Sequence, residues 1–175
     1  APLFNDPDLD SIASGTTNDE TVLEFDFIPL GEVVLFRYVF SSEEYNEYVC
    51  SNFNDAFGFF LSGPGLNGPY TDEGVNIAII PDTYLPVTIN TLNNGSVGSN
   101  GTADNCPDEY LANSAYFIDN ASNPDFSATQ MDGFSVILEA RATVECGEMY
   151  HIKMAVSDVA DGAFDSAVFL ESGSF

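Results

Sequence analysis

Residues 34–40 read Val-Leu-Phe-Arg-Tyr-Val-Phe, and this alternation decides the fold class. Val34, Phe36, Tyr38 and Phe40 fall on one face of an extended strand, because successive side chains of a strand point to opposite faces. Similar short segments recur along the chain, separated by turn residues such as Ser-Gly-Pro-Gly at 62–65. The pattern predicts an all-β fold, a β-sandwich of jelly-roll type with long loops and little helix. Further strands are predicted at residues 23–27, 57–61, 75–80, 87–92, 116–118, 134–143, 150–157 and 167–171.

Two segments between these strands have a distinct character. Residues 42–48 are expected to form one or two helical turns, since Ser42 is a suitable N-cap and acidic residues follow it. Residues 93–113 form a long polar insertion, of a length that is usually functional or mobile. Cys106 lies inside this insertion, and a disulfide to Cys50 would staple it to the body of the domain. Cys146 is left without an assigned partner, and the absence of a Cys-x-x-Cys pair disfavours a sulfur metal site.

The chain carries 28 acidic residues and three basic ones, which gives a formal net charge of −25. Arg37, Arg141 and Lys153 all lie in predicted strands, so the connecting segments contain no basic residue. Acids in those segments can be neutralised only by water, by protons or by a cation from outside. The charge disfavours nucleic acids and anionic membranes as partners. It suits a protein that binds a divalent cation, or one adapted to a saline medium.

The composition favours one folded domain over residues 1–175. A hydrophobic content of 45%, with 15 Phe and 8 Tyr, is too high for a disordered acidic segment. No apolar run approaches the roughly 20 residues of a membrane span. The N-terminal residues lack the pattern of a signal peptide, so we expect the chain to be a processed or excised piece.

Catalytic signatures are weak. His151 is the single histidine, and its alternation with Lys153 predicts a position on a sheet face, opposite to Tyr150 and Ile152. The sequence contains no Gly-x-Ser-x-Gly nucleophile elbow. A pair of glycosidase carboxylates is not excluded among so many acids, but nothing distinguishes one. We expect no enzymatic activity.

Oxygen ligands for Ca²⁺ are abundant in three clusters, at residues 6–10, 42–55 and 158–166. The first resembles the opening of a calcium loop but lacks the glycine and glutamate of an EF-hand, and a solvated N-terminal arm is the alternative. The second and third follow strand ends, where side chains can converge on one cation. Capping of turns by Asp and Asn is the alternative there. The principal predicted ligands are Glu43, Glu44, Asp55, Asp161 and Asp165, followed by Asp158, Asn54, Asp8 and Asp10.

One long motif makes the chain recognisable. Residues 36–65 read Phe-Arg-Tyr-Val-Phe-Ser-Ser-Glu-Glu-Tyr-Asn-Glu-Tyr-Val-Cys-Ser-Asn-Phe-Asn-Asp-Ala-Phe-Gly-Phe-Phe-Leu-Ser-Gly-Pro-Gly. Later segments include Asn76-Ile-Ala-Ile-Ile-Pro-Asp-Thr, Met131-Asp-Gly-Phe, Tyr150-His-Ile-Lys-Met-Ala-Val-Ser-Asp and Phe164-Asp-Ser-Ala-Val-Phe-Leu. In this order, and over nearly the whole chain, they resemble the choice-of-anchor L domain. The resemblance implies a secreted or surface-exposed bacterial module and assigns no biochemical activity.

The chain departs from this family's pattern at its start. Members usually have a further N-terminal portion with its own strands, and this chain begins where that portion would end, near Asp8-Leu9. We therefore expect strands to be missing or to be supplied by another chain, including other copies of this one. Assembly into filaments or a surface layer would follow from such exchange.

These observations predict a non-catalytic extracellular module that serves adhesion or structure and is stabilised by Ca²⁺. The alternative is a calcium-dependent carbohydrate-binding module, in which Tyr45, Tyr48, Tyr70 and Tyr110 would contact a glycan. The absence of Trp weakens that alternative.

Overall fold

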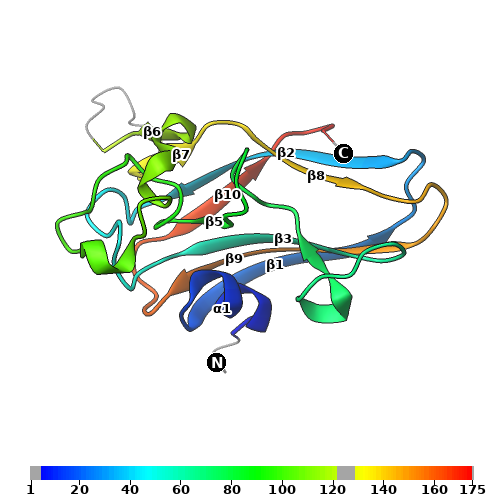
Figure 1. The fold of residues 1–175 in the computed structure, drawn as a ribbon, viewed down its shortest axis with the longest axis horizontal. Helices are drawn as coiled ribbons and strands as arrows, with labels where there is room; N and C mark the ends of the chain where they lie inside the picture. The colour runs from blue at the N-terminus through cyan, green and yellow to red at the C-terminus, as the bar shows by residue number, and fades with distance from the viewer. Residues whose placement is uncertain (1–4, 122–128, 175) are drawn as a thin grey trace.

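The computed structural model describes residues 5–121 and 129–174, which fold into two antiparallel β-sheets packed face to face (Figure 1). The predicted all-β sandwich is therefore confirmed for the described residues. The first sheet has the order β1-β9-β3-β4, and β5 also pairs with β3. Its strands are β1 (Thr17–Phe27), β9 (Tyr150–Val159), β3 (Ala56–Ser62), β4 (Val75–Asn76) and β5 (Val87–Thr88).

The second sheet has the order β10-β2-β7-β6, and β8 pairs with β2 beside β7. β2 contains the alternating residues 34–40, and it pairs with β10 on one side and with β7 and β8 on the other. The strands of this second sheet are β10 (Ser166–Leu170), β2 (Val33–Ser42), β7 (Gly133–Ser135), β6 (Phe117–Asp119) and β8 (Leu138–Thr143).

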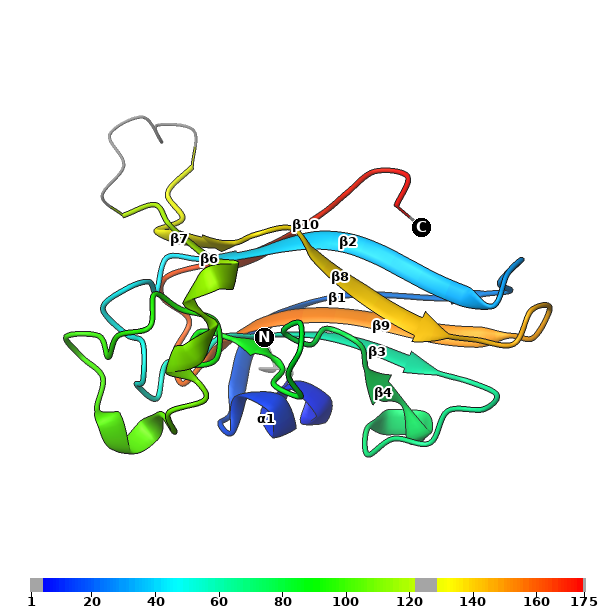
Figure 2. The same cartoon turned by 45° about the horizontal axis from the view of Figure 1, so that its top comes forward.

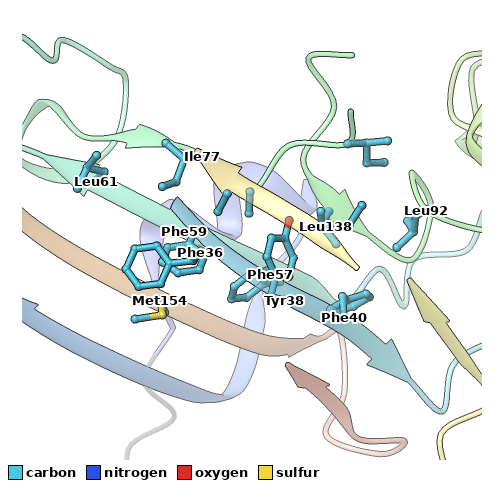
Figure 3. Packing of buried hydrophobic residues seen from close by; sticks show 14 of the residues in the cluster. Phe36, Tyr38, Phe40, Phe57, Phe59, Leu61, Ile77, Leu92, Leu138 and Met154 are labelled. Atoms are coloured by element: carbon cyan, nitrogen blue, oxygen red, sulfur yellow. The ribbon is translucent and has the colours of Figure 1, made fainter. Parts of the chain in front are cut away.

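Aromatic side chains from the two sheets meet between them (Figure 3). Phe36 and Tyr38 of β2 pack on Phe59 and Phe57 of β3, with ring centroids 4.7 Å and 5.1 Å apart. All four side chains are at most 5% exposed, so their burial supplies much of the hydrophobic free energy that joins the sheets. The face of residues 34–40 predicted from alternation is thus the core face.

A short helix, α1 (Pro7–Ala13), covers the outer face of the first sheet (Figures 1 and 2). The Asp6 carboxylate caps it by accepting hydrogen bonds from the backbone N–H groups of Asp8 and Leu9. Leu9 and Ile12 belong to a small buried cluster with Phe60 of β3. Residues 6–10 therefore form the capped start of a packed helix and not a solvated arm.

The prediction of helical turns at residues 42–48 is wrong. β2 continues to Ser42, which pairs with Ser166 of β10 and Gly133 of β7, and turns follow it. Pairing with both neighbouring strands holds Ser42 in extended backbone, so tertiary contacts override its preference for a helix N-cap. A single bond from Tyr48 N–H to the Glu44 carbonyl, 3.1 Å long, is helix-like in its spacing.

The long polar insertion is stapled as predicted. Cys50 and Cys106 form a disulfide, with their Cα atoms 5.4 Å apart, and Cys146 is free and exposed. Backbone bonds from Gly98 N–H to Val49 O and from Thr102 N–H to Cys50 O, both 2.9 Å, add to this attachment. The remaining helical turns are the 3-10 segments η1 (Thr71–Glu73), η2 (Ala103–Asn105) and η3 (Leu111–Tyr116).

Three predicted strands are shorter than expected. Residues 134–143 divide into β7 and β8, because the pairing with β2 is interrupted between Ser41–Phe134 and Tyr38–Leu138, where Phe40 N–H donates to Ser135 Oγ at 2.9 Å. β4 ends at Asn76, whose side-chain oxygen accepts from both Phe59 N–H and Ala78 N–H at 3.0 Å. β5 ends at Thr88, and a bond from Leu92 N–H to Thr88 O closes a turn there. A polar side chain therefore replaces sheet pairing at the end of β4, and a turn replaces it at the end of β5.

Candidate functional site

Acidic residues gather at the end of the sandwich shown on the left of Figure 1, where β2 ends, β3 begins and β9 turns into β10. Glu44 follows β2, Asp55 directly precedes β3, and Asp158 lies at the end of β9. The fold therefore brings together carboxylates that are more than 100 positions apart in the sequence. We call Glu44, Asp55 and Asp158 the buried acid cluster.

Glu44 is the least satisfied member of the buried acid cluster. The residue is 1% exposed, and within the described structure its Oε2 atom has no hydrogen-bond partner. Burial raises the pKa of Glu44 to about 8, and repulsion from Asp55 and Asp161 adds to the increase. A carboxylate in this position carries an uncompensated charge away from water, so it must bind a proton or a cation.

Asp55 is as deeply buried but has partners. Its Oδ1 accepts a hydrogen bond from Val159 N–H at 3.0 Å, and its Oδ2 accepts one from Ser166 Oγ–H at 2.7 Å. Burial nevertheless raises the pKa of Asp55 to about 7. Asp55 therefore joins the end of β9 to the start of β10, and each of its oxygens keeps a further lone pair for a cation.

Asp158 completes the cluster. It is 8% exposed, and its pKa is raised to about 6 by burial first and then by repulsion from Asp165 and Asp19. Three buried carboxyl groups thus have pKa values above their ordinary range in one small region. Perturbed acids of this kind are typical of functional sites, although structural networks also produce them.

Two exposed acids of the turn between β9 and β10, Asp161 and Asp165, and the half-buried Glu43 after β2 lie beside this cluster. Glu43 and Asp165 share two hydrogen bonds: Glu43 N–H donates to the Asp165 carbonyl, and Asp165 N–H donates to a Glu43 carboxylate oxygen. Asp161 accepts a hydrogen bond from Ala163 N–H at 3.0 Å. The alternative to cation binding, in which these acids cap turns, is therefore observed next to the buried carboxylates.

Asp19 is a member of this acidic end that sequence reasoning missed. It lies in an irregularity of β1 between Asn18 and Thr21, with a positive φ of 50°. Its Oδ2 approaches Gly162 so closely that a Cβ added there would lie 2.5 Å away. Nothing in the local sequence separates Asp19 from the other acids of β1, because its role depends on this bulge.

The three basic residues of the chain bind acids elsewhere or face solvent. Lys153 Nζ lies 2.7 Å from Asp6 Oδ2 and 2.6 Å from Asp8 Oδ2, on the outer face beneath α1. Arg37 pairs with Glu171 at 2.8 Å, and Arg141 is exposed on β8. Within the described part of the chain, the acidic end therefore has no basic side chain beside it, as the sequence distribution indicated.

Three residues of the predicted ligand set lie away from the cluster. Asp8 is bonded by Lys153 and by Thr71, and Asp10 accepts from Thr17 N–H at 2.7 Å. The Asn54 amide donates to Ala13 O, and its oxygen accepts from Asn90 N–H at 2.8 Å. These side chains tie α1 and the loop before β3 to their surroundings.

No group of three or more His, Cys, Asp or Glu side chains within residues 5–121 and 129–174 is arranged as a metal site. The acidic end holds ligand types suited to Ca²⁺, but their carboxylates do not converge as in a preformed metal centre. A bound cation would have to draw them together or complete its shell with carbonyls and water.

Four tyrosines are predicted to contact a glycan in the alternative function, and for Tyr45 that prediction is wrong. It is fully buried, and its hydroxyl donates to Leu92 O. Tyr48 packs on Phe53 and Tyr70 packs on Phe60, both partly exposed. Tyr110 lines a polar hollow of about 350 Å³. Tyr110 is thus the tyrosine best placed to meet a ligand.

His151 lies on the outer sheet face, as its alternation predicted. Its Nδ1 is 2.8 Å from Asp26 Oδ1, and Glu24 lies 3.8 Å from Nε2. Tyr150 and Ile152 point the other way and are buried in the core. Both ring nitrogens therefore face carboxylates, which suits a cross-strand surface pair.

Comparison with protein-family models gives a match to the choice-of-anchor L domain over residues 2–175. No curated protein and no solved structure matches the chain. The described residues include no helix long and apolar enough to cross a membrane. The family match spans both sheets and the acidic end, and it confirms the resemblance seen in residues 36–65. The chain therefore belongs to the choice-of-anchor L domain family.

Proposed function

We propose that this domain is a non-catalytic extracellular module, serving adhesion or structure, whose acidic end is stabilised by Ca²⁺. Membership of the choice-of-anchor L family supports the location, because it implies a secreted or cell-surface protein. It also supports a structural role, since the family is one of surface modules without an assigned reaction. The cation is the part of the proposal that this chain's own residues support.

The observation that carries the proposal is the buried Oε2 atom of Glu44, which has no partner in the described structure. Removing a carboxylate from water without a compensating partner is costly. Proximity to Asp55 and Asp161 increases that cost, because like charges repel more strongly where the dielectric constant is low. A divalent cation would replace both the lost hydration and the repulsion.

Calcium fits this end better than a softer metal. Asp and Glu oxygens are the available side-chain donors, and Ca²⁺ takes six to eight oxygen ligands in a flexible geometry. Zn²⁺ prefers sulfur and imidazole ligands, whereas Cys50 is in a disulfide and His151 bonds Asp26. The ligands that we propose are Glu44, Asp55 and Asp158, with Asp161, Asp165 and Glu43 at the rim.

Calorimetric titration of Ca²⁺ into chelator-treated protein tests the proposal. We expect saturable binding, with a dissociation constant in the range of about 10⁻⁴–10⁻³ M that is common in extracellular modules. The Glu44→Gln variant should bind at least about tenfold more weakly. Glu148→Gln is the matched control, because Glu148 is an exposed acid in the turn between β8 and β9. Wild-type protein without saturable binding, or a Glu44→Gln variant with unchanged affinity, would rule out this site.

Calcium-dependent carbohydrate binding is the second candidate. The hollow beside Tyr110 favours it, because it combines an aromatic ring with amide and hydroxyl side chains. However, the Asn90 side chain already bonds Cys50 N–H and Ser51 O, which leaves it little capacity for a sugar. Glycan-array binding that is lost in Tyr110→Ala would establish this function.

A further inference from the structure

β1 and β10 are the terminal strands of the two sheets on the same side of the sandwich. Between them lies an apolar groove of about 320 Å³, which leads into the core. Phe57 of β3 and Met154 of β9 form part of its lining, and Figure 3 shows Met154 at the margin of the labelled core residues. Among the residues that the structure describes, the two sheets therefore do not close over the core along this side.

The lips of the groove are exposed although they carry core-type side chains. Leu23 of β1 is 51% exposed, and Leu170 of β10 is 45% exposed. Leu23 pairs with Met154 and Leu170 pairs with Tyr38, and both of these partners are buried. Leu23 and Leu170 thus point toward the interior of the sandwich, but no segment of residues 5–121 or 129–174 forms a layer in front of them.

The edge of the groove on β1 is acidic. Glu24 and Asp26 alternate with Leu23 and project on the opposite, outer face, where their neighbours on β9 are Lys153 and His151. Lys153 is occupied by Asp6 and Asp8 beneath α1, so it does not offset this charge. His151 contacts both acids, but the side chains of Glu24 and Asp26 remain 50% and 64% exposed. An added strand would place its own outer side chains beside Glu24 and Asp26.

We infer that the groove binds an extended segment of a different polypeptide, one in which apolar and basic residues alternate. Paired along β1, such a strand directs its apolar side chains between Leu23 and Leu170. Its Lys or Arg side chains then lie beside Glu24 and Asp26, which makes the cross-strand pairs favourable. This inference is independent of calcium binding.

A second copy of this chain is a poor occupant by charge. Each copy has a net charge of −25, and the three basic residues are dispersed over β2, β8 and β9. β8, the one edge strand among them, holds Glu139 as well as Arg141 on its outer face. Two such surfaces would repel each other along the acidic edge.

Fluorescence anisotropy with three labelled nine-residue peptides tests the inference at 0.15 M salt. In the first peptide Val alternates with Lys, in the second Val alternates with Glu, and in the third Ser alternates with Lys. We expect saturable binding of the Val/Lys peptide and at least a tenfold weaker affinity for the other two. Equal affinities of the Val/Lys and Ser/Lys peptides would show that net charge alone attracts the peptide, and this result would overturn the inference.

The variant Leu23→Asp separates the groove from general electrostatics. It blocks the apolar lip while making the protein more acidic, so a groove-bound peptide must lose affinity and a charge-bound one must gain it. Leu30→Asp is the matched control, because Leu30 is 96% exposed in the connection between β1 and β2. Unchanged or tighter binding to Leu23→Asp contradicts the inference. So does self-association of the wild type that Leu23→Asp abolishes, because a second copy would then be the occupant.

Discussion

Glu44 and Asp55 are both 1% exposed, but among the described residues only one of these two carboxyl groups has hydrogen-bond donors for both of its oxygens. Asp55 accepts hydrogen bonds from Val159 N–H and Ser166 Oγ–H, whereas Glu44 Oε2 has none in the described structure. Repulsion between the two raises the pKa of Glu44 beyond the effect of burial. The protein therefore stabilises one carboxylate with its own donors and leaves the other to a proton or, as we propose, a cation.

This relationship predicts how stability depends on pH in chelator. The pKa values of Glu44, Asp55 and Asp158 in the folded protein are raised to about 8, 7 and 6. Between the lower unfolded pKa values and these folded values, the folded state binds more protons, so stability falls as pH rises. We expect the midpoint of thermal unfolding to decrease by about 5 °C or more from pH 5 to pH 8. A midpoint that rises over this range would show that the three carboxyls are compensated in some other way.

Asp55→Asn should destabilise the protein with or without Ca²⁺. An amide keeps one acceptor oxygen but places an N–H₂ group against either Val159 N–H or Ser166 Oγ. We expect a loss of about 1–3 kcal/mol in urea unfolding, because a buried donor loses its acceptor. Asp108→Asn is the control, since Asp108 is exposed in the insertion of residues 93–113 and is not one of the proposed ligands. Equal losses in both variants would contradict the structural role of Asp55.

Lys153→Met should be among the most destabilising single changes on the outer face of the first sheet. It removes the cation shared by Asp6 and Asp8, whose side chains are 9% and 7% exposed. Leaving such carboxylates unpaired costs about 3–5 kcal/mol. Arg37→Met removes an ion pair with Glu171 in which both side chains are 44% exposed, and should cost under about 1 kcal/mol. Urea unfolding of the two variants checks this order, and similar losses would contradict it.

Removal of the disulfide by the double change Cys50→Ser and Cys106→Ser should lower stability by about 2–4 kcal/mol. The bond joins residues 56 positions apart and anchors the insertion of residues 93–113. Amide hydrogen exchange should therefore accelerate first in that insertion. Cys146→Ser is the control, because Cys146 is free and exposed. Unchanged exchange at residues 93–113 would show that the backbone bonds at Val49 and Cys50 suffice to hold the insertion.

The strands that could be predicted from the sequence are those with one buried face. β2 and β9 alternate clearly, because Phe36 and Ile152 face the core while Arg37 and Lys153 do not. β4 is short because the Asn76 side chain takes the place of ladder bonds, which depends on contact with Phe59. Residue periodicity does not contain that information.

The helix α1 was missed although its local signals are present. Asp6 is a good N-cap and Pro7 suits the first turn, but only Leu9 and Ile12 show an apolar spacing over seven residues. Its stability comes from packing against Phe60, which is distant in sequence. For the same reason Asn54 could not be separated from the predicted ligands, because its amide bonds the carbonyl of Ala13 at the end of this helix.

Most of the acidic end could be predicted, because carboxylates at neighbouring strand ends tend to meet. Glu44, Asp55 and Asp158 follow from that rule once the strands are placed. Asp19 does not, since a bulge in β1 turns it toward Gly162. The depth of burial of Glu44 could not be predicted either, because adjacent Glu43 remains partly exposed.

Thermal unfolding at pH 8, with Ca²⁺ and with chelator, is the most direct test of the proposed calcium site. We predict that Ca²⁺ raises the midpoint of the wild type by about 5 °C or more. We further predict that Glu44→Gln matches or exceeds the wild type in chelator and has lost most of the response to Ca²⁺. An identical midpoint of the wild type in Ca²⁺ and in chelator would contradict the proposal.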